Sequence, residues 1–114
     1  MTLTQEELRE ISIDGTKVDV AVGPGGSNVV PTPTTYSERF VWKLVLNNTT
    51  AAVRTVTASI GGVIKGTYQI PANTTTILGG EVKNRLFKIL YDNALNMIGD
   101  AGGVEASPTY FDLP

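Results

Sequence analysis

Residues 54–70, RTVTASIGGVIKGTYQI, have the sequence of a β-hairpin. Val, Ile, Thr and Tyr are frequent in these residues, and they favour the pleated backbone of a strand. Gly61-Gly62 suits the positive φ angles of a two-residue hairpin turn. The pattern therefore predicts one strand from Arg54 to Ile60 and a returning strand from Val63 to Ile70.

Short β-prone runs continue on both sides of this hairpin. An earlier strand ends at Asn47-Asn48, and a later one covers Thr74 to Leu78 after a break at Pro71-Ala72-Asn73. Turn residues recur at roughly the eight-to-twelve-residue spacing that is typical of sandwiches and barrels. We therefore expect an all-β protein, an antiparallel β-sandwich of immunoglobulin-like or jelly-roll-like type.

Residues 81–100 match a helical stripe as well as strand alternation. We favour strands there, because Asp92-Asn93 is suited to a turn and Gly99 would end a helix. A last strand is expected over residues 105–111. Pro108 interrupts it and cannot donate to a ladder, so we expect this strand at a sheet edge.

The apolar phase of the strands predicts the core. In the strand before Asn47, one face is expected to carry Phe40, Trp42, Leu44 and Leu46. The expected core residues are Trp42, Leu44, Val56, Ile60, Tyr68, Ile70, Phe87 and Ile89.

A short helix is predicted from Thr4 to Ile11. Thr4 can cap the first amides and Glu7 can reach back to the cap, which is the pattern of a capping box, with Leu3 and Leu8 placed as a hydrophobic staple. Such a helix is too short to be stable alone, so it must pack on another surface.

A strand is predicted over residues 17–22, and residues 23–37 are rich in Gly, Pro and Thr and are expected to form a linker. These features predict an extended N-terminal arm over residues 1–37 followed by a sandwich domain over residues 38–114. We expect the apolar residues of the arm to make assembly contacts. They are Leu3, Leu8, Ile11, Val18, Val20 and Val22.

Composition excludes several classes of function. The 114 residues suffice for one domain. The chain has neither Cys nor His, so it lacks thiolate chemistry and the commonest base and metal ligand, and we expect no catalytic residue, metal or cofactor.

Nine scattered basic residues and a net charge of −2 do not favour binding to nucleic acid. No apolar run approaches the ~20 residues that span a membrane, and no secretion signal opens the chain, so we expect synthesis in a cytoplasm.

Three weaker patterns remain as candidate sites. The glycine-rich residues 23–26 lack the Lys and Ser/Thr of a phosphate-binding loop, and Pro24 removes an amide. Glu81 and Asp100 could meet as an acid and base. Trp42 and the four tyrosines could form a sugar-stacking platform, although the phase of Trp42 favours the core.

From Val41 to Ser107 the order of features resembles the small β-sandwich proteins in the virions of tailed bacteriophages, which serve as decoration, neck or tail components. The resembling segments are residues 42–49, WKLVLNNT, residues 54–57, RTVT, residues 70–75, IPANTT, and Leu95-Asn96 leading to residues 103–107, GVEAS. They cover more than half of the chain.

The resemblance implies a structural role in a virion. We therefore expect a non-enzymatic capsid decoration or cement subunit that binds major capsid proteins and neighbouring copies of itself, assembled in the host cytoplasm. A neck or tail component remains open within that class. A carbohydrate-binding or receptor-binding sandwich is the alternative from a different class.

Overall fold

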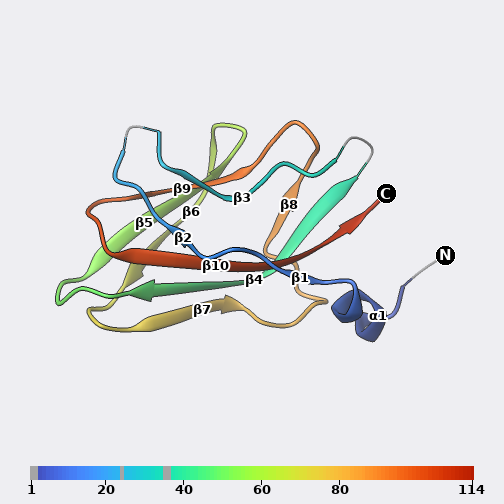
Figure 1. Ribbon diagram of the computed structural model, residues 1–114, viewed down its shortest axis with the longest axis horizontal. Helices are drawn as coiled ribbons and strands as arrows, with labels where there is room; N and C mark the ends of the chain where they lie inside the picture. Colours follow the sequence, from blue (N-terminus) through green and yellow to red (C-terminus); the bar gives the residue numbers. More distant parts are fainter. Residues whose placement is uncertain (1–2, 24, 35–36) are drawn as a thin grey trace.

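The chain folds as two antiparallel sheets packed face to face, in a computed structural model that describes residues 3–23, 25–34 and 37–114 (Figure 1). The larger sheet has the strand order β1-β10-β4-β7, with β2 also on β10 and β8 also on β4, and the smaller sheet has the order β3-β9-β5-β6. The elements are α1 (Gln5–Glu10), β1 (Ile13–Asp14), β2 (Val18–Asp19), β3 (Ser27–Val30), β4 (Glu38–Asn48), β5 (Arg54–Ile60), β6 (Val63–Ile70), β7 (Thr75–Gly79), β8 (Phe87–Ile89), β9 (Leu95–Gly99) and β10 (Val104–Leu113). The expected β-sandwich and the strands favoured within residues 81–100 are confirmed.

The core between the two sheets contains most of the residues predicted for it. Six of the eight are buried there: Leu44, Val56, Ile60, Ile70, Phe87 and Ile89. Tyr68 is partly buried against the same cluster. The exception is Trp42, which packs elsewhere.

The β5–β6 hairpin has the predicted turn. Gly61 and Gly62 both have positive φ angles, 59° and 82°. Two positive φ angles in succession match the right-handed twist of the flanking strands, which is why this turn joins them without splaying them.

The predicted capping box is present at the start of α1. The Thr4 side chain accepts a hydrogen bond from the Glu7 amide, and the Glu7 carboxylate accepts one from the Thr4 amide, both at 3.1 Å. Leu8 is buried on the face that α1 turns toward the larger sheet.

A β-bulge in β4 corrects the predicted face of this strand. Lys43 pairs with Thr109 and Val41 pairs with Tyr110, so Trp42 is left as an extra residue. The extra residue shifts the phase of the strand. Val41 and Leu44 therefore point into the core, whereas Phe40 and Trp42 point to the outer face of the larger sheet.

The outer face of the larger sheet carries a second apolar cluster beneath α1. Its buried residues are Leu8, Phe40, Val82 and Phe111, with Leu3, Trp42 and Leu113 packed against them. The rings of Phe40 and Phe111 stack at 5.5 Å between centroids, and the Arg85 guanidinium covers Phe40 at 4.2 Å. This cluster is the surface on which the short helix packs.

The described part of the predicted arm is built into the sandwich. β1 and β2 pair with β10, and β3 pairs with β9. Val29 and Val30, in the segment expected to be a linker, are 2% and 0% exposed. The division at residue 37 is therefore wrong, because Val29-Val30 gives the Gly/Pro-rich segment enough apolar surface to form a strand. Met1, Thr2, Pro24, Thr35 and Tyr36 lie outside the described residues.

The predicted strand over residues 17–22 changes sheets part-way. The Val20 amide donates to the Val104 carbonyl in the larger sheet, and the Ala21 carbonyl accepts from Gly99 in the smaller sheet. Val22 forms an isolated bridge with Gly99. This crossing breaks the expected alternation, so Val20 is buried and Val22 is 51% exposed.

The last strand, β10, is central in the larger sheet, not at its edge as expected. It pairs with β4 along one side and with β1 and β2 along the other. Pro108 is tolerated because it lies opposite the break between β1 and β2, where its carbonyl accepts from the Gly15 amide at 2.8 Å. A Cβ on Gly15 would lie 2.8 Å from the proline ring, so glycine gives the ring its space.

Candidate functional site

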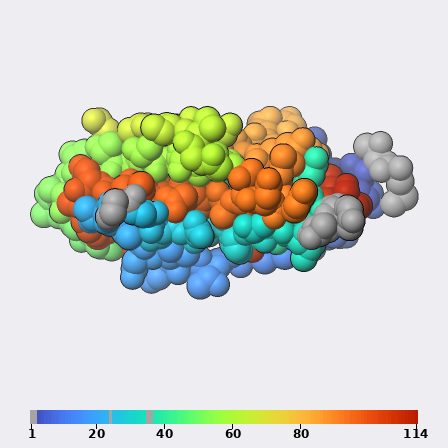
Figure 2. Space-filling model, turned by 90° about the horizontal axis from the view of Figure 1, so that it is seen from above, coloured from blue at the N-terminus to red at the C-terminus, as the bar shows by residue number. Residues whose placement is uncertain are grey.

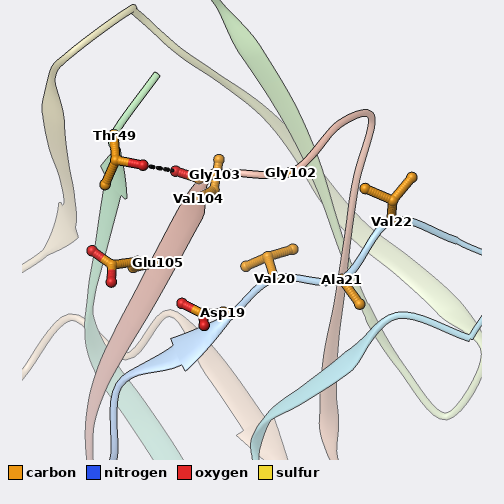
Figure 3. Close-up of a pocket in the computed structure, with 9 residues that line it drawn as sticks. All are labelled: Asp19, Val20, Ala21, Val22, Thr49, Gly102, Gly103, Val104 and Glu105. Carbon is orange, nitrogen blue, oxygen red and sulfur yellow. Dashed lines mark hydrogen bonds between the residues drawn. The ribbon is translucent and has the colours of Figure 1, made fainter.

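A depression of about 420 Å³ lies where β2 and the start of β10 meet (Figure 3). Its lining comes from three segments far apart in the sequence, residues 19–22, Thr49 and residues 102–105. The Thr49 amide and hydroxyl both donate to the Gly103 carbonyl at 2.9 Å, which ties the end of β4 to the start of β10.

Two acidic residues, Asp19 and Glu105, line this depression on neighbouring strands. Glu105 is the direct cross-strand partner of Asp19. Lys17 lies 2.8 Å from the Glu105 carboxylate, and the Asn47 amide donates to the same carboxylate at 3.2 Å. The hydrogen bond from Lys17 lowers the pKa of Glu105, with Asn47 adding to the effect, and it raises the pKa of Lys17. Glu105 is therefore a weak proton acceptor at neutral pH.

The Glu105 contacts belong to a polar chain that crosses the outer face of the larger sheet. The Thr75 hydroxyl donates to Asn47 at 3.0 Å, Asn47 donates to Glu105, and Glu105 pairs with Lys17. The chain thus joins β7, β4, β10 and the β1–β2 connection. Each charged member has a partner, so its geometry supports a structural role.

The structure does not bring Glu81 and Asp100 together. Glu81 lies 3.8 Å from Lys83 and accepts from Asn84, whereas Asp100 accepts from the Thr55 amide at 3.1 Å. The β7–β8 connection that holds Glu81 lies at the α1 end of the sandwich, and the β9–β10 turn that holds Asp100 lies at the other end (Figure 1). Within the described ranges, no group of three acidic side chains could hold a metal ion.

The aromatic residues do not gather into a sugar-stacking platform in the part of the chain that the structure describes. The Trp42 indole N–H donates to the Ser12 hydroxyl at 3.0 Å, and its ring packs against the cluster beneath α1. Tyr110 is buried, Tyr68 is half-buried and Tyr91 is 55% exposed. Tyr36 lies outside the described residues.

The residues predicted as assembly contacts divide into three groups. Leu8 and Val20 are buried within the chain, so they are not available to a partner. Leu3 and Val18 are half-buried. Ile11 and Val22 are 44% and 51% exposed, and they lie in different parts of the fold.

An exposed apolar surface lies instead where two turns meet beside the smaller sheet. We call it the turn patch, and it consists of Val63, Ile64, Leu90 and Tyr91, which are 42–66% exposed. The β5–β6 turn touches the β8–β9 turn, because a Cβ on Gly61 would lie 2.8 Å from Asn93. Figure 2 shows the two segments side by side, yellow-green beside orange.

The sequence contained a signal for the turn patch. Val63-Ile64 and Leu90-Tyr91 are apolar pairs next to turns, and adjacent residues of a strand cannot both face one core. A strand prediction for these residues therefore leaves the second member of each pair outside the core.

The fold defines the chain as a two-sheet β-sandwich with a short N-terminal helix on the outer face of one sheet. No protein-family model, curated protein or solved structure matches this chain. In the part of the chain that the structure describes, no helix has both the length and the apolar character needed to cross a membrane.

Proposed function

We propose that this chain is a non-enzymatic structural subunit of a tailed-phage virion, a decoration subunit that binds the major capsid protein. The observation that carries the proposal is the turn patch. Exposed apolar side chains gathered at two touching turns of a small domain are typical of a site of protein–protein interaction. The resemblance of residues 41–107 to virion sandwich proteins supplies the class of partner.

The way the turn patch is held supports a binding role. Each of its two turns connects strands of the sandwich, and Ile60 pairs with Leu95 immediately beside them. A patch held on paired strands loses little conformational entropy on binding. Lys65 follows Ile64 directly in sequence and is left unpaired by the bulge of β6, so a charged residue adjoins the patch, as at the rim of many interfaces.

The proposal is tested on particles of the source phage. Purified virions are separated into heads and tails, and each fraction is analysed by quantitative mass spectrometry. We expect the chain in the heads at a fixed ratio to the major capsid protein. Recovery with tails or neck would favour that component instead, and absence from all particles would overturn the virion role.

The binding surface is tested with heads assembled without the chain. Purified Ile64→Lys chain should bind these heads at least about tenfold more weakly than the natural chain, because it places a charge in the turn patch. Val53→Lys is the matched control, since Val53 is also exposed (56%) but lies just before β5, at the opposite end of that strand from the turn patch. Equal binding by all three chains would overturn the assignment of the turn patch.

A further inference from the structure

The edge strands of the two sheets differ in how they are protected against pairing with another chain. β1 and β2 have two residues each, β8 has three, and β3 has four with an irregular register. The longer edge strand β6 has a bulge that leaves Lys65 unpaired. Short length, bulges and lysine are the features by which natural sheets block edge-to-edge association. β7, with the sequence TTILG, contains no charge, no proline and no register shift.

The free main-chain groups of β7 follow from its bonds to β4. The Asn48 amide donates to the Thr74 carbonyl, and the Gly80 amide donates to the Trp42 carbonyl, both at 3.0 Å. Every second residue from Thr74 to Gly80 therefore points its N–H and C=O groups toward β4. In an antiparallel ladder the alternate residues point the other way. Thr75 and Ile77 thus direct their N–H and C=O groups away from the sheet, at the border of the molecule in Figure 1.

We propose that β7 pairs antiparallel with β7 of a second copy of this chain, about a two-fold axis. Thr76 lies at the axis, and Thr75 of each copy faces the partner's Ile77. In this register each Thr75–Ile77 pair exchanges both N–H···O=C bonds that the free edge offers. The two larger sheets then form one continuous sheet across the dimer.

A second copy fits this edge because the strand is self-complementary. A two-fold axis brings each side chain against its own strand, so any charge in β7 would face a like charge or lie near one. β7 has no charged residue. Ile77, 57% exposed in the single chain, gains cover from the partner's Thr75. The pairing does not depend on the proposed capsid binding, because it requires only this chain.

Sedimentation velocity of the full chain, from micromolar to millimolar concentration, tests the pairing. We expect a concentration-dependent dimer. Ile77→Lys should weaken it by roughly 100-fold, because two unpaired ammonium groups are brought close together across the axis. Ile64→Lys is the matched control, as Ile64 is also exposed (66%, against 57% for Ile77) but lies beside the bulge of β6. Its dimer should be unchanged.

Hydrogen exchange supplies a second readout that needs no variant. The Ile77 amide should exchange more slowly as the dimer forms. The Thr67 amide is the internal reference. Its partner in β5, Thr57, directs its peptide groups toward β9, so the N–H group of Thr67 points away from the sheet at the free edge of β6. A chain that stays monomeric at every concentration overturns the proposal. So does a dimer that Ile64→Lys weakens as much as Ile77→Lys, or one that leaves the exchange of Ile77 unchanged.

Discussion

The two faces of the larger sheet carry apolar clusters of different kinds. The inner face meets the smaller sheet, and its residues Leu44, Leu46 and Val41 are 0% exposed. In the described residues, the outer face is covered mainly by a six-residue helix and the segment around Val82, and it continues into a chain of hydrogen bonds and one ion pair. The same strands supply both faces. We therefore expect the contribution of each apolar cluster to the unfolding free energy to depend on what covers it, a whole sheet on the inner face and a short helix on the outer face.

Two truncations should show the largest difference between the two clusters in their contribution to cooperative unfolding. Removal of residues 1–30 deletes β1, β2 and β3 and the buried Val20, Val29 and Val30, so we expect loss of the cooperative unfolding transition. Removal of residues 1–12 takes away only α1 and its flanks, and it should leave a cooperative transition at lower temperature. Calorimetry distinguishes the two. A cooperative transition in the longer truncation would show that the first thirty residues are dispensable for the inner core.

Single substitutions should preserve the same ranking. Leu44→Ala should cost about 3–4 kcal/mol of unfolding free energy, because the cavity would lie between two sheets that cannot close over it. Leu8→Ala should cost only about 2 kcal/mol, because a short helix can shift into the space. Denaturant titration gives both values. If the two losses are equal, the outer cluster is packed as rigidly as the inner one.

The hydrogen bond between Trp42 and Ser12 should contribute a smaller amount. A double-mutant cycle with Trp42→Phe and Ser12→Ala should give a coupling free energy of about 1 kcal/mol. The bond is 3.0 Å long and half-buried, and it ties Ser12, the second residue after α1, to the bulge of β4. Additive single changes would mean that the indole N–H is satisfied equally well by water.

The smallest effect concerns pH and the ion pair on the outer face. The lowered pKa of Glu105 means that the unfolded chain binds its proton more tightly than the folded chain, so the pair stabilises the fold above the ordinary value of 4.5. This stabilisation is lost as the pH falls through the folded pKa. Glu105→Gln should therefore reduce the drop in melting temperature between neutral and acidic pH. Glu81→Gln serves as the control, because the ion pair of Glu81 with Lys83 is long, at 3.8 Å, and exposed.

The inner face could be predicted from alternation, and the outer cluster could not. Gly61-Gly62 and the Val- and Thr-rich strands beside it report their own local conformation, so the hairpin was predictable. The bulge at Trp42 depends on the pairing of Lys43 with Thr109 and Val41 with Tyr110, residues more than sixty positions apart. No local sequence pattern indicates that pairing. Because of the extra residue, Val41 lies on the inner face and Phe40 on the outer face, the reverse of the prediction.

The burial of Leu8 and Val20, two of the predicted assembly contacts, was missed for a related reason. Val20 and Leu8 were predicted to face a partner because the first 37 residues, taken alone, lack enough apolar surface for a core. The residues that cover them lie far along the sequence: Leu8 packs with Phe40, Val82 and Phe111, and Val20 is bonded to Val104 of β10. Glu81 and Asp100 were a guess of the same kind, and the fold places them at opposite ends.

The central position of β10 also determines the order in which the two sheets can form during synthesis on the ribosome. All strands of the smaller sheet have been synthesised by Gly99, whereas the larger sheet lacks its middle strand until Leu113. Until then β4 has no partner on one side, and β1 and β2 have none at all. We expect a nascent chain that carries an unpaired, apolar β4 edge until β10 emerges and closes the larger sheet. Pairing across such long sequence separations is slow, so we expect the docking of β10 to limit the rate at which the exposed β4 edge is protected from aggregation.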